Sequence, residues 1–91
     1  MERMTATEQN TRIMLLGSLA ELMGRERRVA LPAEGTTVAG LRERLGQIDQ
    51  SFALALARPG VCASIDHVVV PDDTEVQPGQ EVAFFPLVSG G

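Results

Sequence analysis

The alternation of hydrophobic and polar residues predicts a series of short strands. β-Forming residues dominate several stretches, and turn residues such as Pro59-Gly60 and Pro78-Gly79 separate them. Asp66-His67 divides two neighbouring stretches and predicts a two-residue hairpin turn. The charged residues within residues 25–31 are typical of a strand at the edge of a sheet, where charges discourage unwanted pairing. The predicted strands are residues 12–16, 25–31, 61–65, 68–70 and a last one that begins near residue 81.

One apolar stripe predicts the main helix. Four hydrophobic residues recur at spacings of three, four and three, which places them on one face of a helix. Thr37 is the expected N-cap and Gly46 the expected end, while the charged residues 42–44 are expected to point away from the stripe. The stripe consists of Val38, Leu41, Leu45 and Ile48.

Two further stretches favour short helices. Ser18 and Glu21 have the spacing of a capping box, and Gly24 is suited to the position after the last turn. Residues 50–57 are ambiguous by period, and a short helix is favoured there. Because one amphipathic helix covers only one face of a sheet, the order of elements predicts an α+β roll with the main helix packed across a mixed β-sheet.

Composition and charge narrow the classes of function. A chain of 91 residues with 44% hydrophobic residues has the size of one small domain. Its net charge of −4 argues against a nucleic-acid partner. A single cysteine cannot form an internal disulfide, and no apolar run reaches the ~18 residues that a membrane span needs. We therefore expect a cytoplasmic protein that does not enter a membrane.

The residues most often used in catalysis have simpler explanations in this chain. Cys62, within a predicted strand, is expected to be a small buried hydrophobic residue. His67 lies in a predicted turn without a second metal-type ligand nearby, so we expect no metal site. Because the sequence contains no pattern of a nucleophile with its base, we expect no catalytic activity from the chain alone.

The chain divides into three expected parts. Residues 1–11 are mostly polar and aperiodic, which predicts a disordered leader. Residues 12–86 contain all the predicted elements and form the expected domain. Residues 87–91 form an expected flexible tail, since Pro86 removes a backbone donor and is expected to end the pairing of the last strand.

The tail offers one reactive group, the α-carboxylate of Gly91. This carboxylate is ionised at neutral pH and is a poor electrophile until it is activated, for example as an acyl-adenylate. Gly90 and Gly91 lack a Cβ atom, so this end of the chain can enter a narrow channel. From Leu87 the extended tail reaches about 17 Å. A frayed chain end is the alternative explanation.

The strand order and the terminal sequence resemble those of the ubiquitin-like β-grasp sulfur carriers. Within that group the chain most closely resembles the small subunits of molybdopterin synthase, the MoaD type, over residues 12–91. The resemblance implies an α+β fold, a ubiquitin-like β-grasp roll with one main helix packed across one face of a mixed sheet. The terminal residues that carry it are Phe84, Phe85, Pro86, Leu87, Val88, Ser89, Gly90 and Gly91.

The resemblance also implies a cycle of sulfur transfer in molybdenum cofactor biosynthesis. An E1-like adenylyltransferase would use ATP to activate Gly91, and a sulfur source would convert the terminus into a thiocarboxylate. The larger catalytic subunit of molybdopterin synthase would accept the tail, in an expected heterotetramer, and build the dithiolene of molybdopterin. The carrier itself would bind no cofactor. A carrier for thiazole and thiamine synthesis, a ubiquitin-like protein modifier and a plain interaction domain are the alternatives.

Strand alternation predicts a docking face beside the tail. If the helix covers the face with Ile13, Leu15, Val82 and Phe84, the other face carries Met14, Leu16, Ala83 and Phe85. The resemblance adds Val69 to this face. Scattered surface hydrophobic residues are the alternative explanation. The expected partner-binding residues are Leu16, Val69, Phe85, Pro86, Leu87, Val88 and Ser89.

Overall fold

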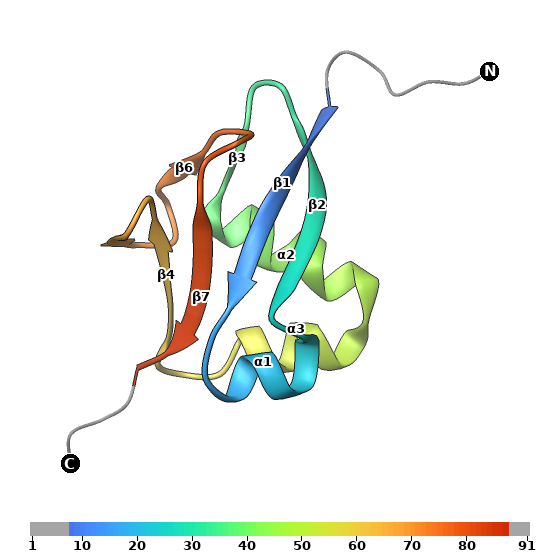
Figure 1. Ribbon diagram of the computed structural model, residues 1–91, viewed down its shortest axis with the longest axis vertical. Helices are drawn as coiled ribbons and strands as arrows, with labels where there is room; N and C mark the ends of the chain where they lie inside the picture. The colour runs from blue at the N-terminus through green and yellow to red at the C-terminus, as the bar shows by residue number, and fades with distance from the viewer. Residues whose placement is uncertain (1–7, 88–91) are drawn as a thin grey trace.

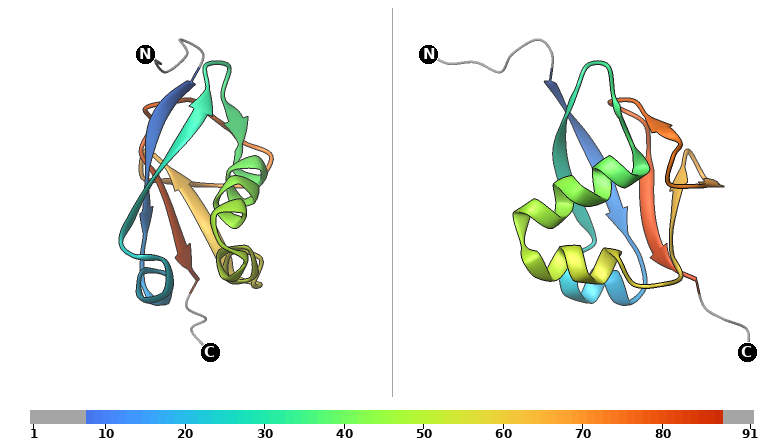
Figure 2. Two further views of the ribbon diagram at one scale, coloured as in Figure 1. Left: turned by 90° about the vertical axis from the view of Figure 1, so that its right-hand side faces the viewer. Right: turned by 180° about the vertical axis from the view of Figure 1, so that it is seen from behind.

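The computed structural model describes residues 8–87, which form a five-stranded mixed sheet with helices behind it and across one end (Figures 1 and 2). The strand order is β2-β1-β7-β4-β5, with β1 parallel to β7 and every other neighbouring pair antiparallel. This confirms the predicted mixed sheet and the place of the charged strand β2 at its edge. The strands are β1 (Glu8–Leu15), β2 (Glu26–Pro32), β4 (Val61–Ile65), β5 (Val68–Val70) and β7 (Val82–Pro86).

A small second sheet was not predicted. It pairs β3 (Thr36–Thr37) with β6 (Glu75–Val76), two residues on each side. The buried Val76 belongs to it and packs into the core. Strands this short carry no periodic signal, so the pairing depends on how the rest of the chain folds.

The first strand begins earlier than predicted. It pairs with β2 from Glu8 onward, so the predicted boundary of the leader at residue 11 is wrong. Thr11 is fully buried, and its hydroxyl accepts a hydrogen bond from the backbone N–H of Gly79 at 3.3 Å. The hydrophobic pattern did not indicate this end of the strand, because its residues are polar and their partners lie on β2 and far along the chain. Residues 1–7 lie outside the described part of the chain.

The core lies between the sheet and α2 (Val38–Ile48), with α3 (Gln50–Leu56) beside it and α1 (Ser18–Met23) at the end of β1 (Figure 2). The four predicted core residues of β1 and β7 are all buried, and three of the four stripe residues are fully buried. Ile48 is the exception, because α2 ends there and the chain turns through Asp49 into α3. The buried residues in question are Ile13, Leu15, Val82, Phe84, Val38, Leu41 and Leu45.

The helix ends were predicted from local sequence signals, and the predictions for Ser18 and Gly46 were wrong. Thr37 caps α2 as predicted, and its hydroxyl accepts from the N–H of Gly40 at 3.0 Å. Gly24 follows α1 as predicted, but the residue that precedes the helix is Gly17, without a side-chain cap from Ser18. Gly46 does not end α2, which continues to Ile48. A Cβ atom at Gly46 would lie 2.7 Å from the Cβ of Ala53. Its missing side chain instead lets α2 and α3 approach closely.

The helix α3 confirms the favoured assignment for residues 50–57. Asp49 is its N-cap, and the carboxylate accepts hydrogen bonds from the backbone N–H of Ser51 at 2.9 Å and from its hydroxyl at 2.8 Å. These two hydrogen bonds lower the pKa of the Asp49 carboxyl group, because they stabilise the charged form.

Arg42 was predicted to point away from the apolar stripe, but its side chain is only 17% exposed and contacts other elements. Its guanidinium donates to the carbonyl oxygens of Leu56 and Val61, and lies 3.1 Å from a carboxylate oxygen of Asp72. The same group lies 5.1 Å from the centre of the Phe84 ring. One long side chain with five donors therefore joins α2 to the end of α3 and the start of β4. Arg44 likewise donates to a backbone carbonyl, that of residue 30, at 3.0 Å.

Candidate functional site

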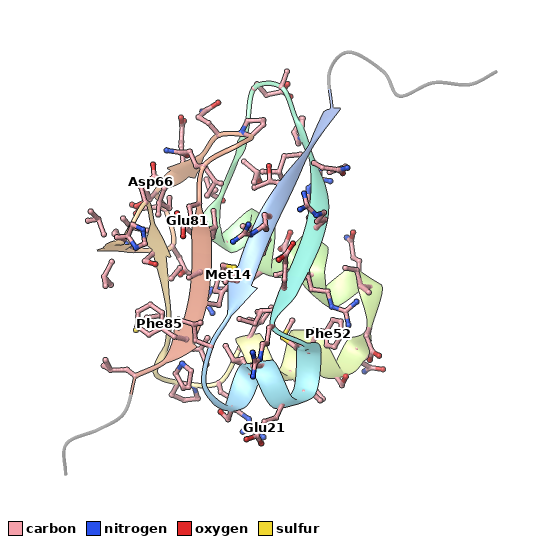
Figure 3. All side chains as sticks on the ribbon, viewed as in Figure 1. Met14, Glu21, Phe52, Asp66, Glu81 and Phe85 are labelled. Atoms are coloured by element: carbon pink, nitrogen blue, oxygen red, sulfur yellow. The ribbon has the colours of Figure 1, made fainter. Side chains whose placement is uncertain are left out.

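The candidate site is the face of the sheet that the helices leave open. The strand registers place Met14, Ala83, Ser64 and Val69 in one row across β1, β7, β4 and β5. Cys62 and Phe85 pair in the next row towards the end of β7. Figure 3 shows Met14 and Phe85 on this face, towards the viewer and away from the helices. The predicted separation of the two faces is therefore confirmed for these residues.

A shallow hollow of about 400 Å³ lies on this open face. Its floor is mostly apolar, and Leu16, which is 45% exposed, stands at the edge nearest α1. His67 and Glu81 form a polar rim, with His67 Nε2 3.5 Å from a carboxylate oxygen of Glu81. An apolar floor with a polar rim is the composition of a protein interface. The lining residues are Met14, Leu16, Ser64, His67, Glu81, Ala83 and Phe85.

The rim depends on a tight turn between β4 and β5. Asp66 and His67 have positive φ angles of 50° and 73°, as two-residue hairpin turns require. The N–H of Asp66 donates to the carbonyl of Glu81 at 2.7 Å, and the N–H of Glu81 donates to the Asp66 carboxylate at 3.0 Å. This exchange fixes the turn against the start of β7. The predicted surface position of His67 is confirmed, since its side chain is 82% exposed.

The charged half of the open face lies away from the hollow. On β1 and β2, Arg12 and Arg28 each lie within 3.5 Å of the Glu26 carboxylate. All three side chains are exposed, so these ion pairs add little to stability. The open face therefore changes from charged residues at the β2 edge to apolar residues beside the end of β7.

The structure brings some of the predicted partner-binding residues together and separates others. Leu16 and Phe85 both line the hollow. Val69 lies on the same face at the edge strand and is 63% exposed, but it does not line the hollow. Leu87 is exposed, while Pro86 is half-buried and packs towards α1. The predicted Val88, Ser89, Gly90 and Gly91 lie outside the described residues.

The pairing of β7 continues past Pro86, contrary to the prediction. Pro86 pairs with Val61, and the N–H of Leu87 donates to the carbonyl of Gly60 at 2.6 Å. Successive backbone donors point to opposite sides of a strand, so the donor that Pro86 lacks would point away from β4. The loss of that donor therefore does not interrupt the β4–β7 ladder.

Cys62 is not buried, which corrects the prediction. Its side chain is half-buried on the open face, opposite Phe85, and its sulfur lies 3.6 Å from the carbonyl oxygen of Gly60. The core positions of β4 are Ala63 and Ile65 instead. The alternation from Ala63 to Ile65 was the signal that could have placed Cys62 on the open face.

Residues 8–87 contain neither a metal-ligand cluster nor a membrane-spanning helix. In this part of the chain, no three His, Cys, Asp or Glu side chains are grouped so that they could share a metal ion. None of the described helices is long and apolar enough to cross a membrane.

Comparison with protein families and curated proteins gives consistent matches. Residues 13–91 match the model of the ThiS family. The molybdopterin synthase sulfur carrier subunit of Haemophilus influenzae is 32% identical over 79 residues, which cover 87% of this chain and 96% of that protein. The protein of the same name from Escherichia coli is 31% identical over 80 residues, with 88% and 98% covered.

Solved structures show the same fold. SAMP1 from Haloferax volcanii superposes with a TM-score of 0.69 at 24% identity, and covers 90% of this chain and 99% of its own. The Haloferax volcanii HVO 2177 protein superposes with a TM-score of 0.78 at 16% identity, with 100% and 94% covered. At these identities the likeness concerns the fold alone, and it confirms the predicted ubiquitin-like β-grasp roll.

Proposed function

We propose that this chain, which belongs to the ThiS family, is the sulfur carrier subunit of a molybdopterin synthase. The names of the two curated relatives support this function, since both align over nearly their whole length. The observation that carries the proposal is the position of the apolar hollow beside the last described residue of the chain. One partner surface can therefore bind Leu16 and Phe85 and receive the terminal residues at the same time.

The chemistry that we propose takes place on the carboxylate of Gly91. One carboxylate oxygen attacks the α-phosphorus of ATP in an E1-like adenylyltransferase, which releases pyrophosphate and leaves an acyl-adenylate. A sulfur nucleophile at the level of hydrosulfide then adds to the carbonyl carbon, and AMP departs. The chain now ends in a thiocarboxylate, in which sulfur replaces one oxygen. Activation is needed because a free carboxylate is a poor electrophile.

Delivery follows in the larger catalytic subunit. The thiocarboxylate sulfur forms a bond to a carbon of the cyclic pterin precursor, with loss of an oxygen leaving group. Water then cleaves the acyl–sulfur bond, which leaves the sulfur on the pterin and restores the Gly91 carboxylate. Two such transfers complete a dithiolene. The carrier supplies no cofactor of its own, and we place the cycle in the cytoplasm, in a heterotetramer with the larger subunit.

Docking on the open face explains why a short tail is sufficient. The four residues after Leu87 reach at most about 14 Å when extended. The partner's pocket must therefore lie close to the docked surface. The apolar lining of the hollow by Met14, Leu16 and Phe85 favours an apolar group of the partner at this position.

Intact-protein mass spectrometry tests the proposal directly. Protein isolated from cells is expected to include a form with one terminal oxygen replaced by sulfur. The larger subunit and the pterin precursor together are expected to return this form to the carboxylate. Deletion of Gly91 is expected to abolish the sulfur-bearing form, whereas deletion of Glu2, the matched control at the other end, is expected to retain it.

The same measurement separates the alternatives. A product in which Gly91 is joined to lysine side chains of other proteins would identify a protein modifier. Sulfur that reaches a thiazole precursor and not the pterin would identify a carrier for thiamine synthesis. A chain that never acquires sulfur in the presence of an adenylyltransferase, ATP and a hydrosulfide source would contradict both kinds of carrier.

A further inference from the structure

Two glycines hold the last residues of β7 at the end of the sheet. Gly17 lies between β1 and α1, and Gly60 precedes β4, so they come from distant parts of the sequence. Both have positive φ angles, 59° for Gly17 and 88° for Gly60, a conformation that L side chains rarely adopt. They contact two successive residues, Pro86 at the end of β7 and Leu87 directly after it. We call these four residues the exit clamp.

Gly17 holds the proline side of the exit clamp. A Cβ atom at this position would lie 3.2 Å from Cγ and 3.3 Å from Cδ of Pro86, which is tighter than ordinary contact. Only a residue without a side chain therefore lets the proline ring lie against the backbone here. The neighbouring Leu16 ties the same segment to β7, because its N–H donates to the carbonyl of Phe84 at 3.0 Å.

Gly60 holds the other side of the exit clamp. Its carbonyl accepts the hydrogen bond from the N–H of Leu87 at 2.6 Å, which extends the β4–β7 ladder past Pro86. The left-handed φ of Gly60 sets the direction of this carbonyl. The side chain of Leu87 is 63% exposed, so this backbone hydrogen bond, and not burial of the side chain, holds the residue.

We propose that Gly17 and Gly60 are positioning residues for sulfur delivery. By holding Pro86 and Leu87, they fix the point and direction from which the terminal residues leave, relative to the hollow on the open face. Docking of the open face then places the terminus in the partner's pocket. This inference rests on the proposed function. It implies that the hollow determines the affinity for the larger subunit, whereas the exit clamp determines how fast sulfur is transferred once the carrier is bound.

The expected size of the effect follows from the length of the tether. With the exit clamp intact, four residues follow Leu87, whereas release of Pro86 and Leu87 leaves six residues after Phe85, which stays paired with Cys62. The effective concentration of the terminus at a docked pocket would fall by about twofold from the longer tether alone. Loss of direction adds to this, since misplacement by ~1 Å can cost about 100-fold in rate. We therefore expect a decrease of about tenfold in transfer.

Matched glycine substitutions isolate the exit clamp. Gly17→Ala and Gly24→Ala alter the two ends of the same helix, and both place alanine at a positive φ. Only position 17 would contact Pro86, because a Cβ atom at Gly24 would meet nothing within 4 Å. Gly60→Ala and Gly79→Ala form a second pair, with φ angles of 88° and 91°, and a Cβ atom at Gly79 would also meet nothing.

The measurement uses full-length carriers that bear a chemically prepared terminal thiocarboxylate, mixed with the larger catalytic subunit and the pterin precursor. Single-turnover transfer at saturating subunit gives the rate, calorimetry gives Kd, and thermal melting shows that each variant is folded. We expect Gly17→Ala and Gly60→Ala to transfer about tenfold more slowly than their controls. Kd is expected to change by less than about threefold, because the hollow is unaltered. Gly60→Asn is expected to restore part of the rate, since asparagine tolerates a positive φ.

Other outcomes overturn the inference without affecting the proposed function. If the wild-type carrier transfers sulfur and the clamp variants match their controls, Gly17 and Gly60 do not position the terminus. Weaker Kd with an unchanged saturated rate would mean that they shape the docking face instead. If the wild-type carrier itself transfers no sulfur to the pterin, the proposed function fails, whatever the variants do.

Discussion

The two faces of the central sheet are built from neighbouring residues of the same strands. On β7, Phe84 is fully buried beneath the helices, while Phe85 lies half-buried on the open face beside the hollow. On β1, Leu15 is likewise buried beneath the helices, and Met14 lies half-buried on the open face. Both faces of β7 are apolar, so hydrophobicity alone does not distinguish the core from the open face at this strand. The difference comes from α2, which covers one face and leaves the other free for a partner.

We expect the covered face to contribute to stability, and we propose that the open face contributes to association with the larger subunit. A residue that is already covered in the free domain contributes its burial to folding. A residue that remains exposed contributes mainly when a partner covers it. Substitutions at neighbouring positions should therefore give opposite results in two measurements, stability of the free domain and affinity for the larger subunit.

Phe84→Ala is expected to have the largest effect. The ring is 0% exposed, so its removal leaves a cavity and is expected to lower the free energy of unfolding by about 3–5 kcal/mol. The loss of the contact with the Arg42 guanidinium adds to this. Urea denaturation followed by circular dichroism measures the change. A loss below about 1 kcal/mol would contradict the assignment of this face to the core.

Phe85→Ala is expected to weaken binding and spare the fold. Loss of an aromatic anchor from the floor of the hollow should cost about 2 kcal/mol of association with the larger subunit, or about 30-fold in Kd. Calorimetry on the purified pair measures this. Leu54→Ala is the control, because Leu54 is 67% exposed on α3, away from the open face. Equal affinities of the Phe85 variant and the wild type would show that the partner docks elsewhere.

The smallest effect is expected for Cys62→Ser, with Ala63→Ser on the same strand as its comparison. Ala63 is buried, so Ala63→Ser places a hydroxyl in the core and is expected to cost about 1–3 kcal/mol. Cys62 is only half-buried on the open face, so Cys62→Ser is expected to change stability by less than ~0.5 kcal/mol. Thermal melting compares the two variants. Sulfur transfer by Cys62→Ser is expected to be unchanged, and a folded variant unable to transfer would give the thiol a role.

Much of the fold could be predicted from local patterns. Alternation predicted the covered residues of β1 and β7, and the spacing of Val38, Leu41 and Leu45 predicted the buried face of α2. The missed features depend on distant partners. Gly46 is needed because Ala53 packs against it, and Arg42 leaves the solvent because it reaches carbonyl oxygens of other elements. The neighbouring residues in the sequence do not indicate such distant partners.

Only part of the candidate site was predicted, because the rest also depends on residues that are distant in the sequence. Leu16 and Phe85 follow from strand alternation and do line the hollow. The rim of His67 and Glu81 depends on hydrogen bonds between the β4–β5 turn and the start of β7, which no single segment reveals. Cys62 was misplaced because both faces of β4 carry small residues, which gives a weak alternation. The roles of Gly90 and Gly91 stay predictions, since these residues lie outside the described chain.

The parallel pairing of β1 with β7 sets the order in which the domain can be completed during synthesis. Ile13 pairs with Val82, so two neighbouring inner strands come from opposite ends of the described chain. The antiparallel pair of β1 and β2 is local and can form early, but the inner edge of β1 has no partner until β7 has been made. A ribosome that stalls before β7 therefore releases a chain with an exposed strand edge, which is prone to aggregation. A folded domain therefore always contains β7, the strand that leads to its terminal residues.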